Sequence, residues 1–301
     1  MGRTYKVFSS GWTYFMNSVL VIGSNGQLGT DLVKTFRKSG WKVKGVDHNE
    51  ISVERIDSVS SVLKKFRSDW IINTAAFHKV EECEKNSQIA WEVNALGPYN
   101  VSSIAKELGA LTLFISSDYV YSGNKGLPYN ENDHVSPINI YGHSKAGGEA
   151  VTLATNSNNL VVRIAGAFGS AGSRAKGGNF VETILNKAKK GEQIKIVEDI
   201  FFSPTYTLDA SKKVLVLLEN SRSGIFNVSN SGFTSFYEFA KHIIKLAGLY
   251  ADLLPINFDQ KALPKRPMNS SLDVTKVEKS LNESPNWLEG LQNYLIEKGY
   301  F

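Results

Sequence analysis

Three side chains with acid–base and hydrogen-bonding groups stand in an order that suits the reduction of a carbonyl. Tyr141 and Lys145 are four residues apart, so on a helix both side chains would project from one face. A free tyrosine has a pKa of roughly 10, and a nearby ammonium favours the phenolate, so we expect Lys145 to lower the pKa of Tyr141. Ser117 follows the apolar run 111–115, which predicts a buried strand ending beside a ligand. We predict that Ser117, Tyr141 and Lys145 are catalytic and protonate a carbonyl oxygen as hydride arrives.

A Tyr-x-x-x-Lys pattern alone occurs in many exposed helices, but a second motif supports it. The apolar run 18–22 is followed by Gly23-Ser-Asn-Gly-Gln-Leu-Gly29 and then by an amphipathic helical pattern to about residue 38. Strand, glycine loop and helix are the context that a dinucleotide-binding fingerprint requires. Glycines let the backbone approach a pyrophosphate, and the helix N-terminus offers it N–H groups. We predict that Gly23, Asn25, Gly26 and Gly29 bind the cofactor, together with Tyr141 and Lys145.

Further cofactor contacts are expected at the ends of the next two strands. Asp47 follows the predicted strand 41–46, at about the distance from the glycine loop where an acid binds the adenosine ribose. The alternative role for Asp47 is that of a turn residue. An acid here favours NAD over NADP, because it would repel a 2′-phosphate. His48 could contribute to the same site, Ile51 is predicted to border the adenine, and Ala75 and Ala76 keep the chain narrow where a cofactor could lie.

Strands alternate with helices up to residue 164, which predicts an α/β fold with a doubly wound, parallel Rossmann-type sheet. We expect an N-terminal extension at 1–15, a dinucleotide-binding domain at 16–165 and a smaller, mostly C-terminal α/β substrate lobe at 166–301. Some segments of that lobe can return to the sheet. Residues 83–108 are predicted to be helical with an interruption at Gly97-Pro98, and residues 166–178 to form a glycine-rich loop. Later helices are predicted at 179–190, 207–219, 235–247, 274–281 and 287–298, and strands at 193–197 and 225–228.

Composition excludes several classes of protein. The chain has 301 residues and a formal net charge of +5 without a run of Lys and Arg, which argues against nucleic-acid binding. No apolar stretch is long enough to span a bilayer, so no membrane partner is expected. The single cysteine, Cys83, excludes an internal disulfide and a cysteine-based metal cluster, and it suits the cytoplasm. The residues themselves predict no metal site.

The two motifs together resemble the extended short-chain dehydrogenase/reductase superfamily and, within it, the dTDP-4-dehydrorhamnose reductase family. The resemblance extends from about Met16 to the C-terminus. Its most specific segments are Ser-Ser-Asp-Tyr-Val-Tyr-Ser-Gly at 116–123 and Pro-Ile-Asn-Ile-Tyr-Gly-His-Ser-Lys at 137–145. The segments 23–29, 73–81, 178–180, 203–205 and 266–270 also fit the family.

This resemblance implies roles for particular residues. Tyr141 would donate the proton to the C4 carbonyl oxygen of a keto-sugar nucleotide, Lys145 would hold the nicotinamide ribose, and Ser117 would bond the same carbonyl. NADPH or NADH would supply the hydride, and dTDP-L-rhamnose for polysaccharide synthesis would be the product. Five positions match cofactor contacts of the family: Gly26, Gln27, Leu28, Ala76 and Phe77. Five match its substrate contacts: Ser117, Asp118, Tyr119, Asn179 and Arg266.

The resemblance also implies a possible homodimer, with Mg²⁺ bound by acids at the dimer interface. Asp31 occupies one such position. One segment departs from the family, which often has Arg-Thr-Ser-Trp after the fifth strand with a tryptophan that touches the substrate. Residues 163–166 read Arg-Ile-Ala-Gly here, so the identity of the sugar stays open.

Three other functions share part of this pattern with a reductase. A sugar 4,6-dehydratase needs an Asp-Glu pair after the Ser or Thr, but Asp118 is followed by Tyr119, so elimination is not expected. A nucleotide-sugar 4-epimerase needs only the hydroxyl, the tyrosine and the lysine, and it remains an alternative. The non-catalytic regulatory subunit of methionine adenosyltransferase resembles the same segments, so a binding role also remains open.

Overall fold

A six-stranded parallel sheet forms the centre of the protein. The computed structural model describes residues 5–7, 13–15, 17–172, 177–281 and 284–300. The strands are hydrogen-bonded in the order β12-β7-β6-β5-β3-β4, and every neighbouring pair is parallel. Their bounds are β3 (Ser18–Ile22), β4 (Lys42–Val46), β5 (Trp70–Asn73), β6 (Leu111–Ser117), β7 (Leu160–Ile164) and β12 (Gly224–Asn227). This arrangement confirms the predicted parallel, doubly wound fold.

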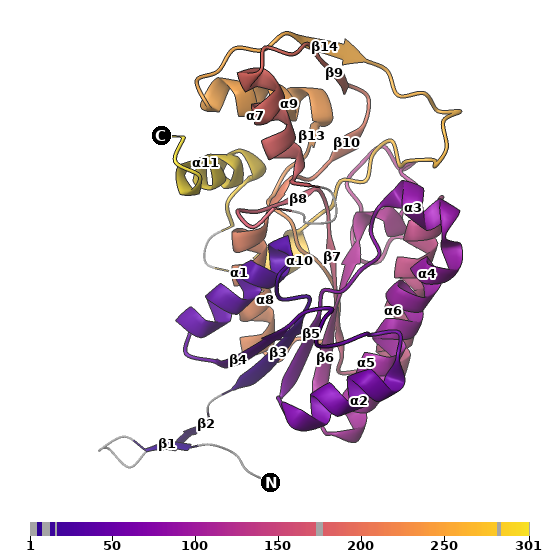
Figure 1. Ribbon diagram of the computed structural model, residues 1–301, viewed down its shortest axis with the longest axis vertical. Helices are drawn as coiled ribbons and strands as arrows, with labels where there is room; N and C mark the ends of the chain where they lie inside the picture. Colours follow the sequence, from indigo (N-terminus) through magenta and orange to yellow (C-terminus); the bar gives the residue numbers. More distant parts are fainter. Residues whose placement is uncertain (1–4, 8–12, 16, 173–176, 282–283, 301) are drawn as a thin grey trace.

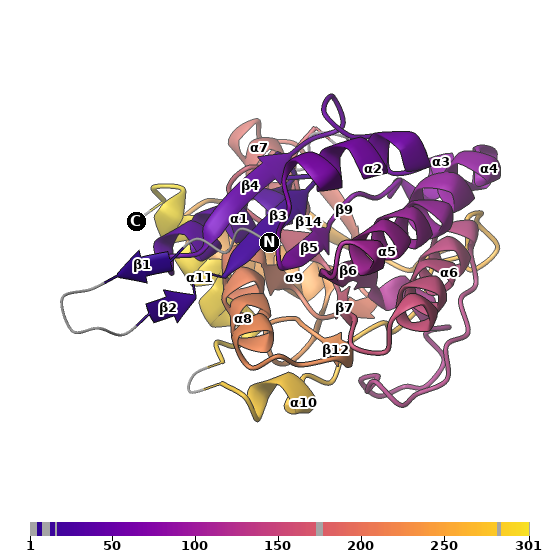
Figure 2. The same ribbon diagram turned by 90° about the horizontal axis from the view of Figure 1, so that it is seen from below.

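Helices cover both faces of this sheet (Figures 1 and 2). One face is covered by α1 (Gln27–Lys38), α8 (Thr207–Glu219) and the short α10 (Thr275–Glu278). The other is covered by α2 (Ile56–Lys65), α5 (Gly97–Glu107) and α6 (Ile140–Thr155). Because both faces are covered, the strands read as continuous apolar runs rather than as alternating ones.

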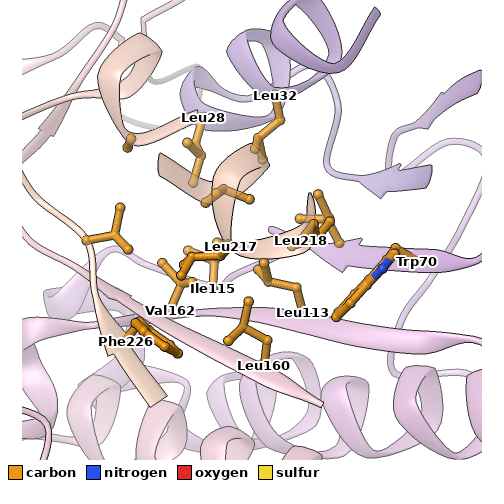
Figure 3. Packing of buried hydrophobic residues seen from close by; sticks show 14 of the residues in the cluster. Leu28, Leu32, Trp70, Leu113, Ile115, Leu160, Val162, Leu217, Leu218 and Phe226 are labelled. Carbon is orange, nitrogen blue, oxygen red and sulfur yellow. The ribbon is translucent and has the colours of Figure 1, made fainter. Parts of the chain in front are cut away.

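Strand β3 shows how one short run serves two cores. Val19 and Val21 pack into the cluster beneath α1 and α8, whereas Leu20 and Ile22 pack into the cluster beneath α2 and α5. Successive side chains of a strand point to opposite faces, so these four adjacent apolar residues contribute two side chains to each core. Figure 3 shows the first cluster, with Leu28 and Leu32 of α1 above the sheet. Burial of each such side chain stabilises the fold by roughly 1.5–3 kcal/mol.

The segment between β5 and β6 is one nearly continuous helical stretch. It contains α3 (Val80–Lys85), α4 (Ser87–Trp91), the π-helix η1 (Glu92–Leu96) and α5. The interruption predicted at Gly97-Pro98 was wrong. Pro98 lies in the first turn of α5, directly after the widened turns of the π-helix η1. A proline is tolerated in a first helical turn, because the N–H that it lacks has no obligatory partner there.

A second lobe covers one end of the sheet (Figure 1). Its own core joins α7 (Phe180–Lys189), α9 (Phe236–Leu246) and α11 (Trp287–Glu297) to the parallel strands β9 (Ile194–Val197) and β14 (Leu253–Ile256). Two short strand pairs connect it to the sheet: β8 (Ala167–Phe168) with β11 (Thr205–Tyr206), and β10 (Phe201–Phe202) with β13 (Thr234–Ser235). We propose that 16–165 and 166–301 are the two parts, with α8 and β12 returning to the sheet.

Two predicted segments overlap the undescribed parts of the chain. The expected loop at 166–178 contains the strand β8, because Ala167 and Phe168 find partners in β11, and residues 173–176 lie outside the described residues. Within the expected extension 1–15, β1 (Tyr5–Val7) and β2 (Thr13–Phe15) form an antiparallel pair, and residues 1–4 and 8–12 lie outside the described residues. No helix in the described part of the chain is long and apolar enough to cross a bilayer.

Candidate active site

A cleft of about 1210 Å³ opens at the carboxyl ends of β3, β5 and β6, beneath the second lobe. Its position follows from the strand order. The chain leaves β3 for β4 on one side and then returns to β5 on the other, so the loops after β3 and β5 separate and leave a crevice. All three predicted catalytic residues and most of the predicted cofactor residues line this one cleft.

The glycine loop after β3 is packed too closely for side chains at two positions. Gly23 has φ +78°, and a Cβ there would lie 2.4 Å from Oγ1 of Thr74. A Cβ on Gly29 would lie 2.1 Å from the carbonyl oxygen of Gly23, so only glycine lets α1 approach the loop this closely. The loop is further held by the N–H of Gly26, which donates to the Gly23 carbonyl at 3.0 Å.

The N-terminus of α1 points its first turn at the cleft. Gly26 is the cap residue, no side chain caps the helix, and the first turn contains no acid. Gln27, Leu28 and Gly29 line the cleft beside it. Free N–H groups and the positive end of a 12-residue helix together favour an anion at this point.

Gln27 ties this loop to the second lobe. Its Oε1 accepts hydrogen bonds from the backbone N–H of Gly169 at 3.1 Å and from Nδ2 of Asn179 at 3.2 Å. Asn179 caps α7 through its Oδ1, and its Nδ2 also reaches the hydroxyl of Tyr294. Both ends of the Asn179 amide therefore have partners within the protein, although the residue lines the cleft.

The three predicted catalytic residues come from two adjacent elements. Ser117 is the last residue of β6, and Tyr141 and Lys145 lie in the first two turns of α6. Asn139 caps this helix by accepting from the N–H of Gly142 at 2.8 Å. A Cβ at Gly142 would lie 2.1 Å from the carbonyl oxygen of Tyr119, so this glycine lets α6 lie directly against the helical turn Asp118–Val120 that follows β6.

The electrostatics of this group differ from the expectation. Burial raises the pKa of Tyr141, and a hydrogen bond with Ser117 opposes that rise. Lys145 is 1% exposed, and its Nζ donates to the carbonyl oxygen of Ile115 at 2.6 Å. Burial lowers the pKa of Lys145 to about 7, and the charge of Glu149 opposes the shift. The expected lowering of the Tyr141 pKa by Lys145 was wrong for this structure, since burial of the phenol is the largest cause of the shift and raises the pKa.

Asp118 is buried next to Ser117. The hydroxyl of Ser117 donates to Oδ1 of Asp118 at 2.9 Å, and the hydroxyl of Ser270 donates to Oδ2 at 2.5 Å. Burial raises the pKa of Asp118 to about 6, and these two hydrogen bonds limit the rise. The carboxyl group thus has both oxygens engaged by hydroxyl donors.

A buried ion pair lies behind Lys145, and sequence reasoning did not find it. Arg163 of β7 is 1% exposed, and its Nε and Nη2 donate to the two carboxylate oxygens of Glu149 at 2.8 and 2.6 Å. Its Nη1 donates to the hydroxyl of Tyr121 at 2.5 Å. The sequence could have indicated Glu149, because it stands four residues after Lys145 and therefore one helical turn away on the same face.

Tyr119 and Arg266 also line the cleft. The ring of Tyr119 meets the ring of Tyr141 edge to face, with centroids 5.7 Å apart. Burial raises the pKa of Tyr119 to about 12, and the neighbouring Arg266 limits that rise. Arg266 also donates to the carboxylate of Glu81. A cation is therefore held beside Tyr119, whose ring contacts that of the predicted proton donor.

Only some of the remaining predicted cofactor residues lie in the cleft. His48, Ile51, Ala75 and Ala76 line the cleft, whereas Asp47 and Phe77 lie outside its lining. The carboxylate of Asp47 accepts from Nδ2 of Asn25 at 2.9 Å and from the N–H of Asn49 at 2.9 Å. It therefore organises the glycine loop and the turn after β4. The backbone of Phe77 is bonded at both its N–H and its carbonyl oxygen by the side chain of Asn94 in η1.

Asp31 does not fit a magnesium site. It is 2% exposed within α1, and its Oδ2 accepts from the hydroxyl of Thr207 at 2.5 Å. Burial raises its pKa, which is unfavourable for a ligand of a divalent cation. In the parts of the chain that the structure describes, no group of three His, Cys, Asp or Glu side chains could hold a metal ion.

An aromatic wall closes the second-lobe side of the cleft, and no local pattern predicted it. It is formed by Phe180, Phe202, Phe236 and Phe239. The rings of Phe202 and Phe236 stack with centroids 4.1 Å apart. Gly166 has φ +46°, and a Cβ there would lie 2.3 Å from the ring of Phe202. The segment without a tryptophan thus lies against a phenylalanine from another part of the chain.

Known proteins resemble this chain over nearly its whole length. A family model described as RmlD substrate binding domain matches residues 16–299. The spore coat polysaccharide biosynthesis protein SpsK of Bacillus subtilis is 34% identical over 284 residues, which are 94% of this chain and 98% of that protein. A dTDP-4-dehydrorhamnose reductase of Aggregatibacter actinomycetemcomitans is 31% identical, over 92% of this chain and 98% of that protein.

Solved structures agree with these relatives. A dTDP-4-dehydrorhamnose reductase of Bacillus anthracis in complex with NADP has a TM-score of 0.89 at 32% identity, over 94% of this chain and 100% of that one. These similarities confirm the predicted enzyme class, an NAD(P)H-dependent oxidoreductase. The chain belongs to the RmlD substrate binding domain family.

Proposed function

We propose that this enzyme reduces the C4 keto group of a nucleotide-linked 4-keto-6-deoxy sugar, with dTDP-4-dehydrorhamnose as substrate and dTDP-L-rhamnose as product. The observation that carries the proposal is the convergence of Ser117, Tyr141 and Lys145 on the cleft that the glycine loop opens. Relatives that are 31 and 32% identical are named as reductases of this sugar nucleotide, which supports the choice of substrate.

The proton chemistry follows from the burial of the phenol. Because burial raises the pKa of Tyr141, its hydroxyl carries a proton at neutral pH and can donate it to the carbonyl oxygen. The hydroxyl of Ser117, beside Tyr141, would bond the same oxygen as negative charge develops on it. Reduced nicotinamide, when bound, supplies the hydride to the carbonyl carbon. Lys145 would bind the nicotinamide ribose from its place between Tyr141 and Glu149 on α6.

The cofactor fits the residues present. The uncapped N-terminus of α1 and the glycine loop would hold the pyrophosphate, and Ala75 and Ala76 would lie along the cofactor. His48 and Ile51 border the end where the adenosine would lie. The carboxylate of Asp47 is held by Asn25 and lies outside the cleft lining, so it supports the loop rather than repelling a 2′-phosphate. Both NADPH and NADH are therefore candidate hydride donors.

On the substrate side, Arg266 and Tyr119 would contact the nucleotide sugar directly. The guanidinium of Arg266 in the cleft lining is suited to an anionic diphosphate, since it offers several donors and a permanent charge. Asp118 and Asn179 would act indirectly, because their polar atoms are bonded to Ser117 and Ser270 and to Gln27 and Tyr294. The phenylalanine wall beside Gly166 would decide which sugar is accepted.

The sequence and the resemblance also implied a magnesium ion, a homodimer and a cytoplasmic location. Magnesium is not part of it, because Asp31 is buried against Thr207. A homodimer and a cytoplasmic location are kept as proposals that rest on the resemblance and on the single cysteine.

The direct test is to incubate the protein with a dTDP-4-keto-6-deoxy sugar and with NADPH or NADH in turn, and to follow the near-ultraviolet absorbance of the reduced cofactor. Consumption of one reduced cofactor per sugar supports the reductase. Protein that already carries NAD and converts the sugar nucleotide without net consumption of cofactor would indicate an epimerase. Absence of turnover together with co-purification of a synthetase would indicate the regulatory role.

Tyr141→Phe tests the assigned proton donor. Turnover should be abolished while the binding of NADPH, measured by its fluorescence, is largely retained, because only the hydroxyl is removed. Tyr99→Phe on α5 is the matched control, since Tyr99 is 47% exposed and lies outside the cleft lining. A Tyr141→Phe enzyme with near wild-type turnover would remove Tyr141 from this role.

A further inference from the structure

Gln27 faces the cofactor site with its backbone and the second lobe with its side chain. It is the first residue of α1, a helix that no side chain caps. The first N–H groups of a helix have no partner within it, so the N–H of Gln27 belongs to the set that would bind the pyrophosphate. Its Oε1 accepts from the N–H of Gly169 at 3.1 Å and from Nδ2 of Asn179 at 3.2 Å. The function proposed above uses only the backbone of this residue.

The hydrogen bonds of Gln27 continue into the helices of the second lobe. Asn179 caps α7, since its Oδ1 accepts from the N–H of Glu182 at 2.9 Å. Its Nδ2 also lies 3.1 Å from the carbonyl oxygen of Gly169 and 3.2 Å from the hydroxyl of Tyr294 in α11. That hydroxyl donates to the carboxylate of Glu182 at 2.5 Å. One amide therefore joins the glycine loop to both α7 and α11.

The elements that Gln27 holds also form the substrate side of the cleft. Phe180 and Thr183 of α7 line the cleft, and so do Ala167 and Phe168 of β8. Asn179 is 6% exposed, so its bonds to Gln27 are shielded from competing water. The place of α7 relative to the glycine loop thus depends on the Gln27 side chain.

We propose that Gln27 is a positioning residue that couples the cofactor site to the substrate lobe. NADP(H) bound at the glycine loop fixes the backbone of Gln27, and the side chain then holds α7 where it receives the nucleotide sugar. The proposal rests on the reductase function given above. It adds a second role to a residue that the resemblance assigns only to cofactor binding.

The coupling has a physical origin in conformational entropy. A phosphate that accepts from the N–H of Gln27 restrains the backbone on which the side chain is carried. Binding of the nucleotide sugar then has less ordering left to achieve, so the two ligands favour each other. Coupling between two sites typically changes an affinity by about 5–150-fold, and it acts equally in both directions.

Gln27→Met removes the side-chain acceptor and keeps both the backbone N–H and the length of the side chain. The measurement is the dissociation constant of dTDP, obtained by calorimetry with and without saturating NADP⁺, a pair of ligands that cannot react. In the wild type, NADP⁺ should tighten dTDP binding at least about fivefold. In Gln27→Met, the two constants should agree within about twofold. Gln88→Met is the matched control, because Gln88 is exposed on α4 outside the cleft lining, and it should retain the wild-type ratio.

Asn179→Asp breaks the same link from the other side. Aspartate keeps the oxygen that caps α7 but loses the amide group that donates to Gln27. The effect of NADP⁺ on dTDP binding should therefore fall at least about twofold. Gln27→Met combined with Asn179→Asp should lower it no further than Gln27→Met alone, because both changes remove one interaction.

Hydrogen exchange tests the link with NADP⁺ as the only ligand. In the wild type, NADP⁺ should slow amide exchange in peptides from residues 177–189 at least about threefold. In Gln27→Met, this protection should disappear, whereas peptides from residues 24–30 should be protected in both proteins. Protection at 24–30 shows that the cofactor is bound in the variant.

Three results would overturn the coupling role. One is a wild type whose affinity for dTDP does not depend on NADP⁺. Another is a Gln27→Met protein that retains the wild-type ratio, and the third is protection of 177–189 that survives in Gln27→Met; both would mean that the cofactor contacts the second lobe directly. Failure of the wild type to oxidise NADPH with the keto sugar, or to bind dTDP, would instead reject the proposed reaction or its nucleotide. Hydrogen exchange with NADP⁺ alone would still decide the role of Gln27.

Discussion

Replacing Arg163 by methionine would leave a carboxylate buried without its counter-charge. Arg163 is 1% exposed and makes two hydrogen bonds to Glu149, which is 4% exposed, and a third to the hydroxyl of Tyr121. Methionine has a similar length and no charge, so the change removes the pair without opening a large cavity. The effect is therefore chiefly electrostatic.

The expected cost is large for a single substitution. Removal of one partner from a buried ion pair typically destabilises a protein by roughly 3–5 kcal/mol, because the remaining charge stays uncompensated. This is a substantial fraction of the roughly 5–15 kcal/mol that separates most folded domains from the unfolded chain. We expect the free energy of unfolding of Arg163→Met to fall by about 3–5 kcal/mol in a guanidinium chloride titration followed by circular dichroism.

A second substitution isolates the charge. Glu149→Gln in the Arg163→Met background removes the unpaired carboxylate, so the double variant should recover at least about 2 kcal/mol relative to Arg163→Met alone. The reasoning would be refuted by a single variant that loses less than about 1 kcal/mol, or by a double variant no more stable than the single one. Either result would mean that packing around the guanidinium, and not the buried charge, stabilises this part of the fold.

Two further predictions concern the glycine loop and the buried aspartate. Gly29→Ala should weaken NADPH binding at least about tenfold in a fluorescence titration, since its Cβ would lie 2.1 Å from the Gly23 carbonyl oxygen and α1 must move away. Gly40→Ala, where nothing lies within 4 Å of the new Cβ, is the control and should leave that affinity unchanged; equal affinity in both variants would contradict the role of the loop. Burial of Asp118 raises its pKa from 3.8 to about 6, so this group favours the folded state most at low pH and loses that contribution as pH rises through about 6. The stability of Asp118→Asn relative to wild type should therefore increase by about 2 kcal/mol between about pH 4 and about pH 8, and a difference that does not vary with pH would show that the carboxyl group is not buried as described.

Local sequence was enough to predict the elements that carry the site. The glycine spacing at 23–29 depends only on a tight turn between a strand and a helix, and the structure has that turn. Tyr141 and Lys145 share a face of α6 because helical periodicity alone places residues four apart together. Ser117 could be placed at the end of β6 because an apolar run ends there. Each of these features is set by neighbours within a few residues.

Electrostatics and long-range contacts were decided by the tertiary structure. The direction of the Tyr141 pKa shift depends on burial beneath the second lobe, which residue spacing does not reveal. Asp118 meets Ser270 across 152 positions of the chain, and β12 returns to pair with β7 after the excursion through the second lobe. No periodic sequence pattern predicts such pairs, because they form only when distant segments of the chain pack together.

The sequence by itself therefore determined the fold class, the cofactor-binding loop and the identity of the reactive side chains, since these depend on local backbone geometry and side-chain chemistry. Only the tertiary structure decided which groups are desolvated and which are paired. The carboxylates of Asp31 and Asp47 accept hydrogen bonds from Thr207 and Asn25, respectively. That of Asp118 is buried and accepts a hydrogen bond from the hydroxyl of Ser117. The physical reason is that the free energy of a charge depends on the medium and partners that surround it, and folding alone supplies both.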